Sequence, residues 1–368
     1  MRNLLLEKVA LSLFIIAVVV AILILAKVVL IPLAISFFFT YLLYPVVNRI
    51  EKWGVHRGAA IFMVLFVALL LIGGTILGIS VRLSNMTIDY ADIKEQVDTK
   101  ADMITDALED KLGLNSNTID NYTKKASSAI TDSWENKMGS FFAATTNTLF
   151  QIGILPVFTF FLLFYRTKTA YFIFRLVGRK NKPVALRVLK DVSTVATQYL
   201  LGQLLVILVL TILNTAGLYI IGVPNGIVFG ALAAVLNLIP YLGMFTGSMI
   251  TILYVIFTIS DPFNMALQVM LMYMGVQFLE NNLITPNIVG NNIKINPFAI
   301  IFGILIANLI WGVAGMLLVI PFLAIFKIIM RNIDDLKPFA YLISEKGMEN
   351  HKIKIAWWDN LVAKFKKS

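Results

Sequence analysis

The sequence predicts an all-α protein that crosses a membrane several times. Of its 368 residues 59% are hydrophobic, against about 45–50% in soluble domains. The apolar residues form long blocks, and the charged residues, only 14% of the chain, gather between them. A soluble core cannot hold so much apolar surface, so the bilayer is the expected solvent.

About eight hydrophobic segments are expected. A crossing needs about 20 apolar residues, and two segments of about 35 exceed this length, which predicts hairpins or broken helices there. The first segment resembles a signal peptide, but hydrophobicity resumes at once, so a retained anchor is expected. The segments are 9–26, 28–47, 59–81, 141–165, 196–221, 225–259, 264–285 and 297–330.

The chain divides into five predicted regions. Apolar residues at heptad-like spacing within the polar stretch 82–140 predict a soluble helical insert. Trp357, Trp358 and Phe365 alternate with lysines near the end of the chain, a pattern typical of an amphipathic segment at a membrane surface. The regions are 1–81 with amino-terminal transmembrane helices, the insert 82–140, 141–195 with a helix and a basic connector, the transport core 196–330, and the amphipathic tail 331–368.

Positive charge in the short loops predicts the orientation in a cell membrane. Loop 48–58 and the connector 166–195 are basic and are expected in the cytoplasm. The insert then lies outside, and both termini are expected inside. This distribution accounts for the net charge of +10 without a nucleic-acid partner. The aromatic residues within the connector favour contact with anionic membrane lipids.

Enzyme chemistry is not expected. The chain has no cysteine and only two histidines, His56 and His351, both in charged loops, so neither a metal site nor a cofactor is predicted. Neither a P-loop nor a Gly-x-Ser-x-Gly nucleophile motif occurs. Transport would therefore be passive or coupled to an ion.

Glu280 is the candidate functional residue, because it is an acid well inside an apolar block. A helix places it on one stripe with Gln277 and Asn281, at i, i+3 and i+4. An acid in the membrane costs several kcal/mol, about 2.5–3.5 for Asp on insertion scales, and usually marks a substrate or ion path. It would carry a proton or sodium, or bind a hydroxylated solute; the alternative is a structural carboxyl group. Pro286 is expected to end the helix soon afterwards.

The two long segments contain an internal repeat. Pro224-Asn-Gly-Ile-Val-Phe-Gly230 matches Pro297-Phe-Ala-Ile-Ile-Phe-Gly303, and each is followed by Asn-Leu-Ile, at Asn237 and Asn308. Interrupted paired segments are a sequence pointer to a transporter site. The alternative is two ordinary kinked helices in which the asparagines only join neighbours. The expected breaks are at Pro240, Gly243, Gly312 and Gly315, and Asn214, alone in its segment, is interpreted as a packing residue.

At these residues the chain resembles the AI-2E family of membrane proteins, the autoinducer-2 exporter-like group. The resemblance implies a permease that forms a homo-oligomer, pentameric in well-described members, and that exports small polar solutes. Some members are described as cation/proton antiporters. It rests on Tyr199-Leu-Leu-Gly-Gln203, Gly222-Val-Pro224, Asn237-Leu-Ile-Pro-Tyr-Leu-Gly243, Glu280-Asn-Asn-Leu-Ile-Thr-Pro286-Asn-Ile-Val-Gly290, Pro297, Gly303, Gly312, Gly315 and Pro321.

The expected function is therefore secondary transport of a small polar solute by alternating access, in which the half 223–330 moves against the amino-terminal segments. Two alternatives remain at this point. One is a monovalent cation/proton antiporter that uses the same Glu280. The other is a membrane scaffold that transports nothing.

Overall fold

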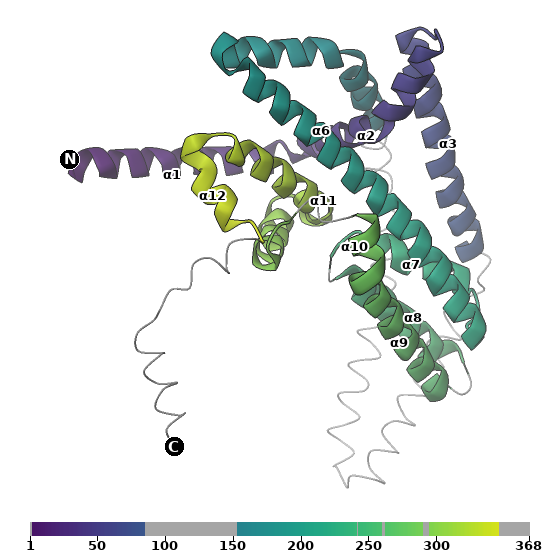
Figure 1. Ribbon diagram of the computed structural model, residues 1–368. Coiled ribbons are helices and arrows are strands. Elements are labelled where there is room, and N and C mark those ends of the chain that lie inside the picture. Colours follow the sequence, from purple (N-terminus) through teal and green to yellow (C-terminus); the bar gives the residue numbers. More distant parts are fainter. Residues whose placement is uncertain (1, 85–152, 241, 260–261, 290–293, 346–368) are drawn as a thin grey trace, which may run out of the picture. The chain divides into compact units, whose positions relative to one another are not determined.

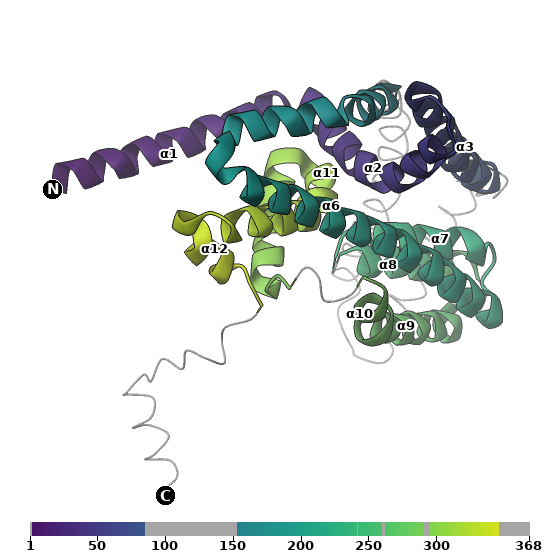
Figure 2. The same ribbon diagram turned by 45° about the horizontal axis from the view of Figure 1, so that its top comes forward.

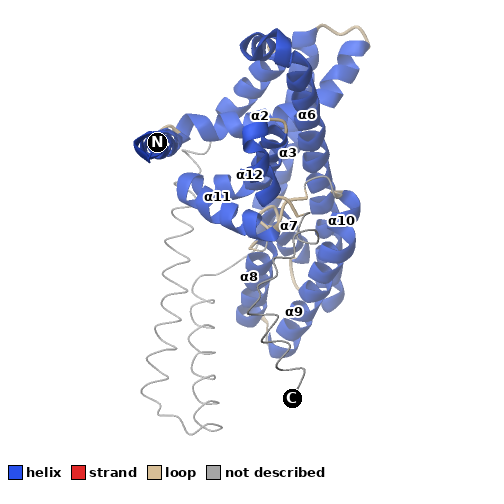
Figure 3. Ribbon diagram, turned by 60° about the vertical axis from the view of Figure 1, so that its left-hand side comes forward, coloured by secondary structure: helices blue, strands red, loops and turns tan. Residues whose placement is uncertain are grey.

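The computed structural model describes residues 2–84, 153–240, 242–259, 262–289 and 294–345, which form helices joined by short turns. Among these residues there is no strand, only an isolated bridge between Ile295 and Ser344 (Figure 3). The all-α membrane class is confirmed, because several described helices are long and apolar enough to cross a bilayer. Most of the predicted insert 82–140, the start of 141–165 and the tail from 346 lie outside the described residues.

The chain forms two compact units. The larger unit consists of Ala21–Lys168 and Gln198–Gly290. The smaller unit consists of Met1–Val20, Thr169–Thr197 and Asn291–Ser368. Each is described by itself, and the elements of both are labelled in Figure 1.

The first two predicted segments join end to end. Helix α1 (Arg2–Leu25) is followed after Ala26 by α2 (Lys27–Lys52). The amide of Ala26 donates to Ile22 O, and the amide of Leu30 donates to Ala26 O, each at 2.9 Å. Ala26, with φ −91° and ψ 13°, is therefore a single non-helical residue that bonds to both helices and separates them.

Three helices share one apolar core in the larger unit. Helix α3 (Arg57–Ser84) returns along α2, and the helix Gly153–Phe164 packs against both. Ser36 Oγ of α2 donates to Leu155 O at 2.9 Å, near the start of the third helix. The buried core residues are Leu43, Val47, Ala60, Ile61, Val64, Leu65 and Leu163. Burying this apolar surface holds the loop at 53–56 and the start of the connector at the same end of the unit.

The remaining helices of the larger unit surround a second interior. Helix α6 (Arg166–Ile221) contributes Gln198–Ile221 to it. Next come α7 (Gly226–Leu236) and α8 (Gly243–Thr258), which pack as a hairpin, and α9 (Pro262–Leu279), which packs on α8 (Figure 1). A π-helical turn, η1 (Glu280–Ile284), leads into α10 (Thr285–Ile288).

Helices α7 and α8 are antiparallel arms, too short to cross a membrane singly. At 11 and 16 residues they are about 16 and 24 Å long, against a hydrocarbon core of about 30 Å. A Cβ on Gly247 of α8 would lie 2.6 Å from Ala233 Cα of α7. Farther from the turn that joins the two arms, the ring centroids of Phe229 and Tyr254 are 4.4 Å apart. The first long segment is therefore a hairpin whose two ends lie on one side.

The second long segment, α11 (Pro297–Arg331) in the smaller unit, is also a hairpin. Gly312 has φ 60° and ψ −140°, a conformation that interrupts the helix. The two arms meet where Gly303 faces Val319 and Leu323. The ends return together: η2 (Asp334–Leu336) and α12 (Lys337–Leu342) pack on α11 (Figure 2). Asn296 Nδ2 donates to Leu342 O at 2.7 Å, which fastens the start of α11 to the end of α12.

Candidate functional site

Glu280 lies at the start of the π-helical turn that follows α9, and it is 8% exposed. Both of its carboxylate oxygens accept a hydrogen bond. Gln277 Nε2 donates to Oε2 at 2.6 Å, and Thr285 Oγ1 donates to Oε1 at 2.6 Å. These two donors offset part of the cost of burying the acid.

The π-turn explains why Thr285 reaches Glu280. Five residues along an ordinary α-helix correspond to about 500°, which points the two side chains to different faces. In the wider turn the backbone amide of Thr285 bonds to Glu280 O, so residue i+5 comes to lie beside residue i. Short π-turns inside helices occur frequently at functional sites. A stripe based on i+3 and i+4 spacing cannot reveal Thr285, so the sequence analysis missed it.

The structure brings Gln277, Glu280 and Asn281 together, as their spacing predicted. Gln277 Nε2 also donates to Asn281 Oδ1, at 3.1 Å. The three differ in burial, because Gln277 is half-buried and Asn281 is exposed. Neighbouring Asn282 donates to Phe278 O on its own helix at 2.8 Å. The polar group therefore runs from the buried Glu280 to the surface of the helix.

Glu280 lies at about the middle depth of the apolar part of α6. Helix α6 and the segment from α9 to Val289 approach closely at two glycines of α6. A Cβ on Gly202 would lie 3.1 Å from Val289 Cα, and a Cβ on Gly217 would lie 2.7 Å from Met272 Cγ. Residue numbers rise along α6 from the first contact to the second and fall along the other segment, so the two segments are antiparallel. Glu280 is midway between Met272 and Val289, and the same level on α6 is Leu210, near the middle of Gln198–Ile221.

The repeat asparagines occupy different surroundings. Asn237 ends α7 and is 9% exposed. Asn308 lies in the first arm of α11 in the smaller unit, and it is exposed. The residue before each asparagine is in close contact with a glycine of the returning arm. A Cβ on Gly243 would lie 1.8 Å from Leu236 O, and a Cβ on Gly315 would lie 2.2 Å from Ala307 O.

The remaining predicted break residues fall into two groups. Pro240 lies in the turn between α7 and α8, and Gly312 provides the break in α11. Pro286 is different, because it lies in the first turn of α10, which runs on to Ile288. The helical path after Glu280 is thus changed first by the π-turn, which sequence spacing did not reveal.

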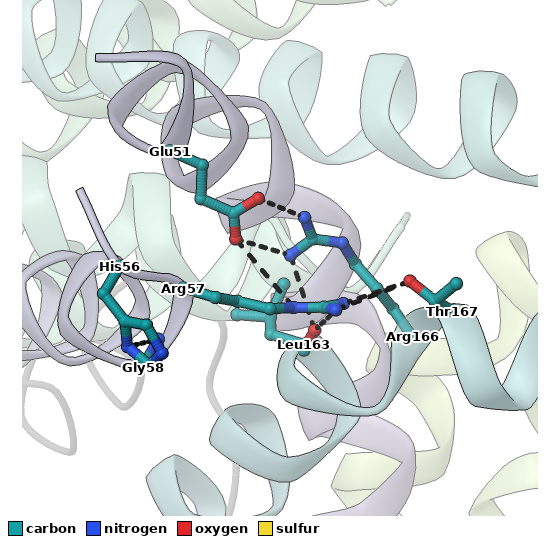
Figure 4. Close-up of polar contacts among 7 residues, drawn as sticks. All are labelled: Glu51, His56, Arg57, Gly58, Leu163, Arg166 and Thr167. Carbon is teal, nitrogen blue, oxygen red and sulfur yellow. Dashed lines mark hydrogen bonds and ion pairs between the residues drawn. The ribbon is translucent and has the colours of Figure 1, made fainter. Parts of the chain in front are cut away.

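A charged cluster lies at the end of the larger unit where α2, α3 and the connector meet (Figure 4). Arg166 donates to both carboxylate oxygens of Glu51 through its two terminal guanidinium nitrogens, Nη1 at 3.0 Å to Oε1 and Nη2 to Oε2. Arg57 donates to Leu163 O at 3.0 Å and lies 4.0 Å from a Glu51 oxygen. The guanidinium of Arg166 also covers the ring of Tyr44, 5.1 Å from its centroid. The sequence analysis counted these charges for orientation and did not predict that they would pair.

No metal site emerges from the residues that the structure describes, where no group of three or more His, Cys, Asp or Glu side chains lies together. A comparison with known protein families matches residues 13–335 to the AI-2E family transporters. The chain belongs to the AI-2E transporter family. The match runs from α1 beyond α11, and it includes Glu280 and both hairpins.

Curated relatives in this family are named as transport proteins. "Putative transport protein YrrI" of Bacillus subtilis (strain 168) is 29% identical over 319 residues, 83% of this chain and 86% of that protein. "Putative transport protein YueF" of the same organism is 28% identical over 54% of this chain and 53% of its own length. "Putative transport protein MT0215" of Mycobacterium tuberculosis is 23% identical over 85% of each. This chain is accordingly a multi-pass membrane protein of a transport family.

Proposed function

We propose that the protein is a secondary transporter that exports a small polar solute of the autoinducer-2 type across the plasma membrane by alternating access. The observation that carries this proposal is the buried Glu280, held between Gln277 and Thr285 at the middle depth of α6. An acid at that depth is costly and usually serves a solute or ion path.

The two hairpins support the same proposal. Each returns to the side from which it entered, and each carries a break in the apolar sequence. Irregular backbone at membrane depth is tolerated only where protein or a water-filled path surrounds it. In secondary transporters such interrupted segments line the solute site. Asn237 and Asn308, one beside each break, are proposed as further polar groups on the path.

Orientation follows from charge. The end of the larger unit with Glu51, Arg57 and Arg166 is proposed to face the cytoplasm, together with the basic connector and the carboxy-terminal tail. A cytoplasmic amino terminus stays a prediction from the sequence. Assembly as a homo-oligomer, pentameric as the family resemblance implies, belongs to the same proposal.

Flux in proteoliposomes tests the role of Glu280. Glu280→Gln keeps the shape of the side chain, and its amide still accepts from Thr285, but it cannot carry a charge or release a proton. We expect solute flux to fall at least tenfold, or to lose its dependence on a proton or sodium gradient. Gln268→Leu, at an exposed polar residue of α9 that pairs only with Asn264, is the matched control and should leave flux unchanged.

The antiporter alternative predicts a different result in the same vesicles. Since Glu280 is the only buried carboxylate among the described residues, it would serve as the proton carrier there too. If sodium drives proton movement in vesicles without any solute, and Glu280→Gln abolishes that movement, the proposal of solute export is wrong and the antiporter is correct. Unchanged flux and unchanged pH dependence in Glu280→Gln would refute the role of Glu280 in both proposals, and a wild-type protein without any flux would favour a scaffold.

A further inference from the structure

We propose that Asn214 binds a neutral, hydroxylated solute inside the larger unit, between α6, α7 and α9. This inference rests on the proposed transport function and names the chemical class of the solute. It starts from one side chain: Asn214 is fully buried, and neither its Oδ1 nor its Nδ2 has a hydrogen-bond partner. Both groups of the amide thus lack the bonds that water would give them, which is unfavourable for the protein without a ligand.

Asn214 belongs to the innermost stripe of α6. Leu210 and Leu218, four residues to either side, are fully buried like Asn214 itself. On one flank, Thr215 is so close to α7 that a Cβ on Gly230 would lie 2.7 Å from its backbone nitrogen. On the other flank, Gly217 faces Met272 of α9. Asn214 therefore points between α7 and α9, toward the interior that α8 completes.

Of the polar groups around Asn214, Thr251 and Glu280 have partners, whereas the hydroxyl of Thr215, the next residue of α6, is buried and has none. Thr251 of α8 is fully buried, and its hydroxyl bonds to Tyr273 of α9 at 3.0 Å and to Gly247 O at 2.9 Å. Glu280 is occupied by Gln277 and Thr285. Asparagine between membrane helices commonly hydrogen-bonds a neighbouring helix. In that role Asn214 would have a protein partner, so interpreting it as a packing residue leaves its burial unexplained.

The position of Asn214 fits the path that Glu280 marks. Leu210 is level with Glu280, and Asn214 lies one turn further along α6, about 6 Å along the axis. Gln277, one turn before Glu280 on the antiparallel α9, is at the level of Asn214. The proposed site would thus be the next polar group that a solute meets beyond Glu280.

The chemistry of the site favours a neutral hydroxyl group over an ion. A primary amide offers two donors and one acceptor, and a hydroxyl group both donates and accepts. Between Gln198 and Leu279 the only charged residue of the sequence is Asp261, which directly precedes Pro262 in the chain. An anion at Asn214 would have no counter-charge on these helices, and an uncompensated charge at membrane depth is very costly. The one acid near this level, Glu280, already accepts hydrogen bonds from Gln277 and Thr285.

Two properties of Asn214→Leu test the proposal in purified, reconstituted protein. The first is thermal stability: leucine has nearly the same size and removes the unpaired amide, so the variant should melt at a higher temperature than the wild type. The second is the response to millimolar erythritol or ribitol, with sodium chloride as the ionic comparison. We expect either polyol to raise the melting temperature of the wild type but not of Asn214→Leu. Polyol flux through Asn214→Leu should be at least tenfold lower than through the wild type.

Thr251→Val is the matched control. It removes a buried polar group that does have a partner, so it should melt at a lower temperature than the wild type and keep the response to polyols. If Asn214→Leu melts at a lower temperature, Asn214 has a structural partner and the proposal is wrong. If it melts higher but keeps the polyol response and the flux, only a water molecule occupies the site, and the proposal is wrong again.

The proposed function can fail separately. A wild-type protein that shows no flux of any solute, but whose melting temperature rises with ribitol only when Asn214 is present, would retain the binding site and lose the transport proposal. Flux that depends on Glu280 but not on Asn214 would retain the transport proposal and refute the binding site at Asn214.

Discussion

The two hairpins have similar sequences but are built differently. In the larger unit, α7 and α8 are separate helices joined by a turn that contains Pro240. In the smaller unit, a single glycine with positive φ, Gly312, breaks α11. Both nevertheless place a glycine of the second arm, Gly243 or Gly315, against the carbonyl that precedes Asn-Leu-Ile. The repeat therefore preserves the contact between the arms rather than the form of the turn.

The glycine of the repeated Pro-x-x-Ile-x-Phe-Gly motif shows a second difference. Gly230 admits the backbone of Thr215 in α6, whereas Gly303 admits the side chains of Val319 and Leu323 in its own second arm. The first hairpin thus uses this position to pack against another helix. The second uses it to close on itself.

Alanine at the shared glycine contact should have the largest effect. In Gly243→Ala and Gly315→Ala a methyl group would lie 1.8 or 2.2 Å from a backbone oxygen, which neither side-chain rotation nor a small shift can relieve. We expect losses above about 3 kcal/mol, beyond ordinary overpacking, seen as aggregation in detergent or failure to accumulate. Gly275→Ala, where nothing lies within 4 Å, should be neutral or slightly stabilising. Normal folding of both contact variants would show that the arms separate freely.

The motif glycines should differ in whether a second substitution rescues them. Gly230→Ala meets Thr215 Oγ1 at 2.6 Å and also the Thr215 backbone nitrogen at 2.7 Å. Because the backbone contact remains, we expect a loss of about 1–3 kcal/mol that Thr215→Ala does not restore. Gly303→Ala meets Val319 Cγ2 at 2.9 Å, so Val319→Ala should restore part of its stability. A double-mutant cycle on melting or denaturant unfolding measures this coupling. Equal rescue in the two hairpins would contradict the proposed difference.

The breaks themselves should show a smaller difference. Gly312→Ala has free space but a strained backbone, since φ is 60°, and it should cost about 1–3 kcal/mol. Pro240 itself has no positive φ, because the proline ring fixes φ near about −65°. Pro240→Ala should therefore cost less than about 1 kcal/mol. Thermal unfolding of the two variants checks this order. A larger loss at Pro240 than at Gly312 would contradict it.

Much of this arrangement was predictable from sequence. Block lengths and Pro/Gly breaks predicted the helical membrane class and both interrupted segments, and spacing predicted that Gln277, Glu280 and Asn281 would share a face. Other features depend on tertiary contacts, which periodicity does not encode. The pairing of Glu51 with Arg166, 115 residues apart, belongs to this group. The π-turn that recruits Thr285 and the junction at Ala26 are local, but they depart from regular helical spacing. The unpaired amide of Asn214 becomes evident only when the side chains around it are placed.

Cysteine labelling tests the central claim, that Glu280 faces a path for polar molecules, most directly. The chain contains no cysteine, so Glu280→Cys and Phe278→Cys each introduce a single thiol into reconstituted protein. Phe278 is 64% exposed on the apolar surface of α9 and should face lipid. We predict that a charged, water-soluble thiol reagent modifies position 280 but not 278, and that transported solute slows the reaction. Modification at neither position, or at both equally, would contradict the account.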